Sequence, residues 1–279
     1  MNLEGKICLI TGATSGIGKE TARALASMGA HIILPARNLE RAERVKADIL
    51  QTTPRAAIEI MECELASFAS ITSFVQSFKA RYSNLHILIN NAGLIETKRK
   101  LSRDGIEMTF AVNHLAPFLL TKLLLDTIQR STPARIINVS SEAHHSTTIN
   151  FDDIEGKKHY NGWRAYAQSK LANILFTRHL AIMLQGTGIS VNCLHPGVVA
   201  TDLFDVIPAP FNFLIKLFMI SPAKGAETTI YLASSPEVEG ITGEYFDKKK
   251  IAIPSIVARD ADIAARLWQL SEQYVVSLF

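Results

Sequence analysis

The sequence predicts a single doubly wound α/β domain, with a central parallel sheet of about seven strands flanked by helices. Short apolar runs alternate with longer amphipathic stretches along all 279 residues. No linker-like, repeated or low-complexity segment breaks this alternation. Because 48% of the residues are hydrophobic and 20% are charged, the chain can build one large core. We therefore expect residues 1–279 to form one domain.

Seven short apolar runs are expected to be the strands of this sheet. They lie at residues 7–11, 31–34, 57–61, 85–89, 135–139, 189–194 and 244–246. Strands that are buried on both faces of a parallel sheet have such near-continuous apolar sequences. The intervening helices are expected at residues 19–28, 39–51, 67–82, 106–129, 165–185, 224–233 and 260–275.

Composition argues against several classes of function. A net charge of +3 is too small to indicate nucleic-acid binding, and the lysines at 248–250 are expected to form a solvated turn. Cys8, Cys63 and Cys193 each lie in an apolar run, which predicts buried thiols. The sequence shows no secretory-signal pattern and no apolar run of the roughly 20 residues that span a membrane. We expect a protein of the cytoplasm or another reducing compartment, not a secreted one.

A glycine loop follows the first expected strand. From Thr11 to Gly18 its spacing is G-x-x-x-G-x-G, inside a strand, loop, helix and strand unit. Glycines let a ligand approach the backbone closely, and the free N–H groups of a helix start can bind a pyrophosphate. A plain tight turn is the alternative. The candidate nucleotide-binding residues are Gly12, Thr14, Ser15, Gly16, Ile17 and Gly18.

The end of the second strand bears on the choice of cofactor. In many dinucleotide-binding folds an acidic residue here binds the ribose 2′-hydroxyl, which Ala36 cannot do. Arg37, with Arg41 one turn later, can instead pair with a 2′-phosphate. A solvated arginine at a helix start is the alternative interpretation. We expect NADP(H) as the preferred cofactor, with NAD(H) possible.

Polar residues follow the fourth strand and recur in the next helix. Asn91, Ala92 and Gly93 stand where the ends of α/β strands bind ligands, although a simple turn would also use them. Pro117 lacks an N–H group, so the carbonyl of Asn113 loses its helical partner. A water bound there would be a proton-relay station, and a simple helix kink is the alternative.

Three further residues carry candidate chemistry. Ser140 closes the fifth strand, where a hydroxyl can bond a substrate carbonyl oxygen. Tyr166 and Lys170 lie one helical turn apart, which places an ammonium near a phenol. A hydrolase is disfavoured because a G-x-S-x-G motif is missing. His144 and His145 lack the spacing of zinc ligands, so no metal is expected.

Together these residues resemble the short-chain dehydrogenase/reductase family over nearly the whole chain. The motifs occur in the family's order: Thr11 to Gly18, Asn90 to Gly93, Asn113, Ser140, Tyr166-x-x-x-Lys170 and Pro196-Gly197-x-Val199-x-Thr201. The resemblance implies a Rossmann-type fold with Tyr166 as the acid/base and Ser140 orienting the substrate carbonyl. It implies that Lys170 lowers the pKa of the tyrosine and bonds the nicotinamide ribose, and that Asn113 holds the relay water.

The resemblance also implies cofactor contacts. Glu64 stands where the family usually has an aspartate that contacts adenine. The other implied contacts are Leu65, Asn91, Ala92, Gly93, Tyr166, Lys170, Pro196, Gly197, Val199 and Thr201. Finer features, at residues 36–38, 171–173 and 194–199, resemble the retinol dehydrogenase-like branch. That branch uses NADP(H) on retinoids and other lipophilic aldehydes and ketones.

Residues 203–222 stand where the family has its substrate lid, and this stretch is rich in phenylalanine and leucine. Contact with a membrane surface, or a helix packed on the core, are the alternatives. The expected function is an NADP(H)-dependent oxidoreductase acting on a lipophilic alcohol and its aldehyde or ketone. The alternatives are a steroid or other secondary-alcohol dehydrogenase and a non-catalytic nucleotide-binding regulatory protein. A homodimer or homotetramer is expected from the resemblance.

Overall fold

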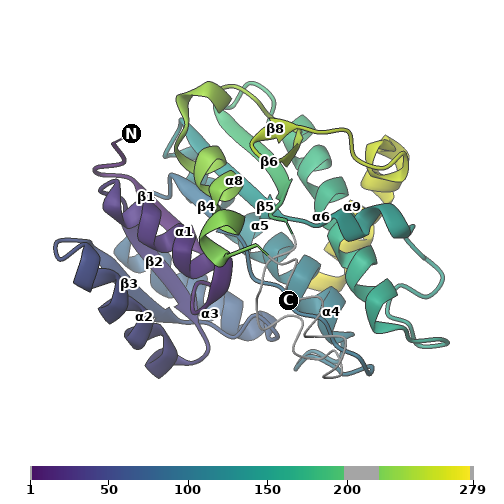
Figure 1. Cartoon of the computed structure of the whole chain (residues 1–279). Coiled ribbons are helices and arrows are strands. Elements are labelled where there is room, and N and C mark those ends of the chain that lie inside the picture. Colours follow the sequence, from purple (N-terminus) through teal and green to yellow (C-terminus); the bar gives the residue numbers. More distant parts are fainter. Residues whose placement is uncertain (1, 198–219, 277–279) are drawn as a thin grey trace.

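An eight-stranded sheet forms the centre of the computed structural model, which describes residues 2–197 and 220–276 (Figure 1). The spatial order is β3-β2-β1-β4-β5-β6-β7-β8, and each neighbouring pair is parallel except β7 and β8. The strands are β1 (Ile7–Ile10), β2 (His31–Ala36), β3 (Ile58–Glu62), β4 (Ile87–Asn90), β5 (Ala134–Val139), β6 (Ile189–His195), β7 (Tyr245–Asp247) and β8 (Lys250–Ile251). The predicted doubly wound sheet is confirmed.

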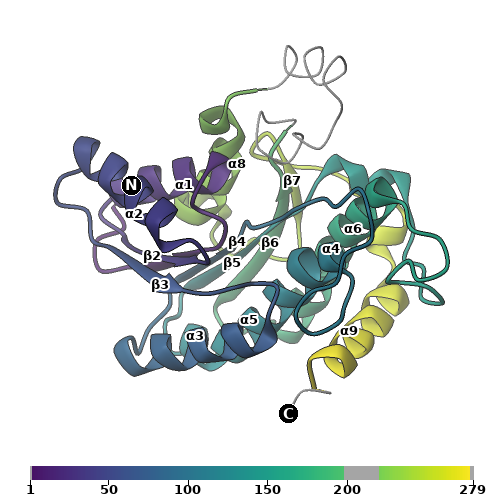
Figure 2. The same ribbon diagram turned by 90° about the horizontal axis from the view of Figure 1, so that it is seen from below.

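Helices cover both faces of the sheet. Figure 2 shows α1, α2 and α8 on one face, with α3 and α5 on the other. The bounds are α1 (Gly16–Ser27), α2 (Leu39–Thr52), α3 (Phe68–Arg81), α4 (Met108–Phe110), α5 (Ala116–Gln129), α6 (Gly162–Met183), α8 (Pro222–Ser234) and α9 (Ala261–Val276). Asparagine or serine side chains cap the N-termini of α2, α3, α6 and α8, which explains where these helices begin.

Strand alternation divides the core into two layers. Leu9 of β1 packs in the layer that contains the side chains of α3, α5, α6 and α9. Cys8 and Ile10 pack in the opposite layer, with Leu25 of α1. Because both faces are covered, every position of such a strand is apolar. The three cysteines are buried and free, as predicted.

The helix predicted over 106–129 is interrupted. A π-helical turn, Ala111–Leu115, separates α4 from α5, and the N–H of Ala116 donates to the carbonyl of Ala111. Pro117 then falls in the first turn of α5, where a missing N–H is tolerated. The π-helical turn and the helices on either side of it form the segment Met108–Gln129, which is long and apolar enough to cross a membrane. However, 78% of its most apolar window is buried in the protein. This segment therefore serves as a core helix.

Candidate active site

A cavity of about 510 Å³ opens at the carboxyl ends of the strands. It lies where the strand order reverses on either side of β1, the position at which open α/β sheets bind ligands. The predicted site residues that line it are Gly12, Thr14, Ser15, Gly16, Ile17, Gly18, Arg37, Glu64, Leu65, Asn91, Ala92, Gly93, Ser140, Tyr166, Lys170 and Pro196. One end of the chain's predicted lid reaches this region, since Ile220 packs against Gly197. Val199, Thr201 and residues 203–219 lie outside the described residues.

The glycine loop packs closely on itself and on the chain after β4 because its glycines lack a Cβ atom. Gly12 has a positive φ of 67°, and a Cβ there would lie 2.7 Å from the Cα of Ala92. A Cβ on Gly18 would lie 2.4 Å from the carbonyl oxygen of Gly12. The loop leads into the first turn of α1, which carries no acidic residue. Its N–H groups therefore suit a phosphate.

Two side chains join this loop to the end of β4. The amide of Asn91 donates to the carbonyls of Thr11 (2.9 Å) and Gly12 (3.2 Å). The hydroxyl oxygen of Thr11 accepts the backbone N–H groups of Asn91 (3.0 Å) and Ala92 (3.1 Å). The predicted residue Asn91 thus builds the nucleotide cradle by bonding the protein backbone.

The far end of the cavity carries charge. Arg37 is 77% exposed and pairs with Glu64, with 3.3 Å between the guanidinium nitrogen and the carboxylate oxygen. The other oxygen of Glu64 accepts the backbone N–H of Ala66 (3.1 Å). Arg41 donates to the carbonyl of Thr14 in the glycine loop (3.1 Å). The exposed guanidinium group of Arg37 can turn toward an added phosphate.

Tyr166 and Lys170 lie on α6 against the end of β5. Tyr166 is 7% exposed and Lys170 is 3% exposed. The Lys170 ammonium nitrogen lies 5.6 Å from the centre of the Tyr166 ring and donates to the carbonyl of Val139 (3.1 Å). The predicted pair is therefore brought together at the buried end of the cavity.

Asn113 lies in the π-helical turn and hydrogen-bonds the segment that follows β4. Its amide oxygen accepts the N–H of Leu94 (2.8 Å), and its amide nitrogen donates to the carbonyl of the same residue (2.9 Å). The amide nitrogen also donates to the hydroxyl of Ser169 on α6 (3.0 Å). Asn113 thus fixes the cavity wall beside the residue that precedes Lys170.

The two serines after β5 have different partners. The hydroxyl of Ser140 donates to the carbonyl of Lys170 (2.7 Å). The hydroxyl of Ser141 instead hydrogen-bonds the phenol of Tyr166 and accepts the N–H of Ala143 (3.2 Å). The sequence prediction placed the carbonyl-orienting hydroxyl on Ser140, and the geometry points to Ser141. Neighbouring residues of an extended chain point to opposite sides, so a shift of one residue exchanges the two hydroxyls.

Comparisons with known proteins agree with this geometry. The family model for short chain dehydrogenases matches residues 6–210. The chain belongs to the short-chain dehydrogenase family. This short-chain dehydrogenase is 42% identical to human retinol dehydrogenase 14 (98% of this chain, 87% of that protein) and 42% identical to human retinol dehydrogenase 11 (97% and 86%). It therefore belongs to the retinol dehydrogenase-like branch.

Solved structures extend the comparison. An uncharacterized protein from Mycobacterium paratuberculosis superposes with a TM-score of 0.82 at 32% identity, covering 99% of this chain and 95% of that one. A Pseudomonas aeruginosa RhlG complex with NADP has a TM-score of 0.72 at 25% identity, covering 94% and 98%. The short-chain dehydrogenase described here is thus an alcohol/carbonyl oxidoreductase of a family that binds NAD(P)(H). Its glycine cradle fits such a nucleotide.

The electrostatics of Tyr166 and Lys170 differ from the prediction in one respect. We expected Lys170 to lower the pKa of Tyr166. In the chain itself burial raises the pKa of Tyr166 to about 12, which the hydrogen bond from Ser141 only partly offsets. Burial also lowers the pKa of Lys170 to about 8, so this side chain is mostly an ammonium at neutral pH but loses its charge as the pH rises through 8. A poised tyrosinate would need further positive charge in the site.

Sequence reasoning missed the residues that hold Ser141. The ring of His144 bonds the carbonyl of Ser141 through Nδ1 (2.7 Å) and accepts the N–H of Ser255 through Nε2 (3.1 Å). This pattern requires the neutral tautomer with a proton on Nδ1. The adjacent Glu142 accepts the hydroxyl of Tyr245 (2.6 Å). The available signal was a histidine three residues after the serine, which we considered only as a metal ligand or hydrolase residue.

Proposed function

We propose that this protein is an NADP(H)-dependent oxidoreductase that interconverts a lipophilic alcohol and its aldehyde or ketone, with Tyr166 as the acid/base. The observation that carries the proposal is a buried tyrosine at the end of a nucleotide-sized cavity, hydrogen-bonded by Ser141 and one turn from Lys170. The names of the relatives, retinol dehydrogenases 11 and 14, support an apolar substrate.

The residues take separate roles in this proposal. Gly12 to Gly18 would hold the pyrophosphate, and Arg37 would pair with the 2′-phosphate that distinguishes NADP(H). When bound, the nicotinamide supplies or accepts the hydride. Tyr166 then gives its proton to the carbonyl oxygen during reduction, while the hydroxyl of Ser141 donates to the same oxygen and orients it.

The substrate side of the cavity supports an apolar ligand. Leu94, Ile95, Met108 and Val112 are among the residues that line the cavity, and Ile95 packs against the cluster that contains Tyr166. These side chains offer no charge to a sugar or an acid, and they gain from burial of hydrocarbon. Three buried free thiols support a reducing compartment.

The test is oxidation of NADPH with a panel of aldehydes and ketones, including retinaldehyde and a steroid ketone. Tyr166→Phe removes the proton donor and is expected to lower kcat by roughly 10² to 10⁴, the usual contribution of general acid catalysis. Tyr274→Phe is the matched control, because its hydroxyl bonds Glu155 and neither of these residues lines the cavity. Equal activity of wild type and Tyr166→Phe would refute the role of Tyr166.

A further inference from the structure

Trp163 is unusually exposed for a residue so close to the candidate active site. It lies in the first turn of α6 and is 51% exposed. The centre of its ring is 5.9 Å from that of Tyr166, with the ring planes 35° apart. The second tryptophan, Trp268, is instead packed against Phe118 and Phe176, with ring centres 4.8 and 5.9 Å away. A single exposed apolar side chain is common on protein surfaces, so the significance of Trp163 rests on its contact with Tyr166.

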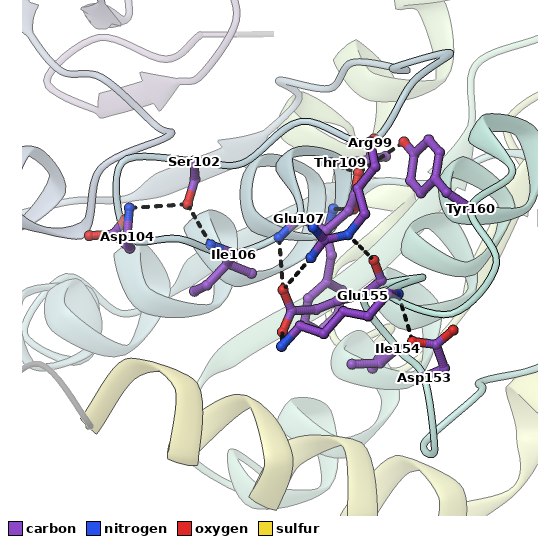
Figure 3. A network of polar contacts seen from close by, with 12 residues as sticks. Arg99, Ser102, Asp104, Ile106, Glu107, Thr109, Asp153, Ile154, Glu155 and Tyr160 are labelled. Atoms are coloured by element: carbon purple, nitrogen blue, oxygen red, sulfur yellow. Dashed lines mark hydrogen bonds and ion pairs between the residues drawn. The ribbon is translucent and has the colours of Figure 1, made fainter.

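The start of α6 is held firmly against the loop that follows β4. A Cβ atom on Gly162 would lie only 2.2 Å from the carbonyl oxygen of Glu96, so the two backbones touch. The hydroxyl of Tyr160 bonds the same carbonyl (2.9 Å) and the buried carboxylate of Glu107 (3.0 Å). Figure 3 shows Tyr160 and Glu107 in this polar network. Trp163 is therefore fixed at the seam between helix and loop.

The same loop provides the apolar wall of the cavity. Leu94 and Ile95 line the cavity, and Ile95 packs against the small cluster of Ala143, Tyr166 and Ala167. Trp163 lies close to this wall, because its ring contacts that of Tyr166 and it follows Gly162, whose backbone touches Glu96. The ring of Tyr166 thus has apolar neighbours both at the cavity wall and at the half-exposed indole of Trp163.

We propose that Trp163 contacts the apolar tail of the substrate and makes the enzyme prefer long or ring-bearing carbonyl compounds to short ones. The inference rests on the proposed function, since the reacting carbonyl must sit at the hydroxyl of Tyr166. The rest of a long substrate then has to pass the tyrosine, where the indole can stack on it. A short aldehyde ends before it reaches Trp163.

The kinetic test compares decanal with propanal at saturating NADPH. Trp163→Ala is expected to raise KM for decanal about tenfold and leave KM for propanal unchanged, because only the longer chain loses a contact. Trp163→Phe keeps an aromatic face and should restore most of the decanal KM. Ile182→Ala is the control, an exposed apolar residue at the opposite end of the same helix.

A binding test needs no turnover. The chain contains two tryptophans, so Trp268→Phe leaves Trp163 as the single indole reporter. Decanal added to the NADP⁺ complex of this variant should shift the emission of Trp163 to shorter wavelength, and propanal should not. The inference is overturned if Trp163→Ala changes the KM values for decanal and propanal by the same factor. It is also overturned if decanal leaves the emission of Trp163 unchanged. Wild type that turns over no carbonyl compound would instead overturn the proposed function, whereas turnover that requires Tyr166 but ignores Trp163 overturns this inference alone.

Discussion

The two serines after β5 give the sharpest test of the site. Ser141 hydrogen-bonds the phenol of Tyr166, whereas Ser140 donates to the carbonyl of Lys170. Ser141→Ala removes the donor that would face the developing negative charge on the substrate oxygen. Loss of one such donor typically lowers kcat by roughly 10² to 10³, or about 3–4 kcal/mol of transition-state stabilisation. Ser140→Ala removes one buried hydrogen bond and should cost about 1 kcal/mol of folding free energy.

The assay is kcat/KM for an aldehyde with NADPH, measured beside thermal unfolding of each variant. We expect Ser141→Ala to be nearly inactive and only slightly less stable, through the lost bond to the N–H of Ala143. Ser140→Ala should keep activity within a few-fold of wild type. Strong loss of activity in Ser140→Ala, with Ser141→Ala still active, would refute the assignment.

Three further predictions concern the cofactor and the core. Arg37→Ala should reduce the preference for NADPH over NADH roughly tenfold or more, and Arg44→Ala, an exposed ion-paired residue of the same region, should not change this ratio of kcat/KM values. Gly18→Ala should abolish nucleotide binding in calorimetric titrations, because the new methyl would lie 2.4 Å from a loop carbonyl. Burial lowers the pKa of His114 from 6.5 to about 4, so the unfolded chain binds a proton there between these pH values while the folded protein does not. This site should therefore remove ~3 kcal/mol of stability as the pH falls from 6.5 to 4, and His114→Gln should show a smaller loss in denaturant titrations across that range.

The fold could be predicted because its signals are local and redundant. β1, β2, β4, β5 and β6 are mostly buried and mostly apolar, and the glycine loop predicts the turn into α1. β8 was missed because two exposed residues, Lys250 and Ile251, carry no periodicity. The π-helical turn at Asn113 was also missed, since Pro117 predicts a disturbance but not the number of residues in the turn.

The site was predicted in its residue types more accurately than in its geometry. Tyr166 and Lys170 share a helix face by spacing alone, and the structure brings them together. The choice between Ser140 and Ser141 depends on which hydroxyl reaches the phenol of Tyr166 and which one bonds the α6 backbone, and no local sequence pattern reports this. The pKa of Tyr166 depends on desolvation by the whole surrounding structure, so a nearby lysine was not enough to predict its direction.

The contacts of Thr11 and Asn91 have a consequence for the cost of binding. These side chains bond backbone groups of the glycine loop and of the chain after β4 in the folded protein itself. The cradle is therefore already ordered before a nucleotide arrives, and little conformational entropy is lost when the pyrophosphate enters. The free energy of the contacts between the loop and the nucleotide should therefore contribute almost fully to the binding affinity. Nucleotide binding should also proceed without a slow step in which the loop becomes ordered.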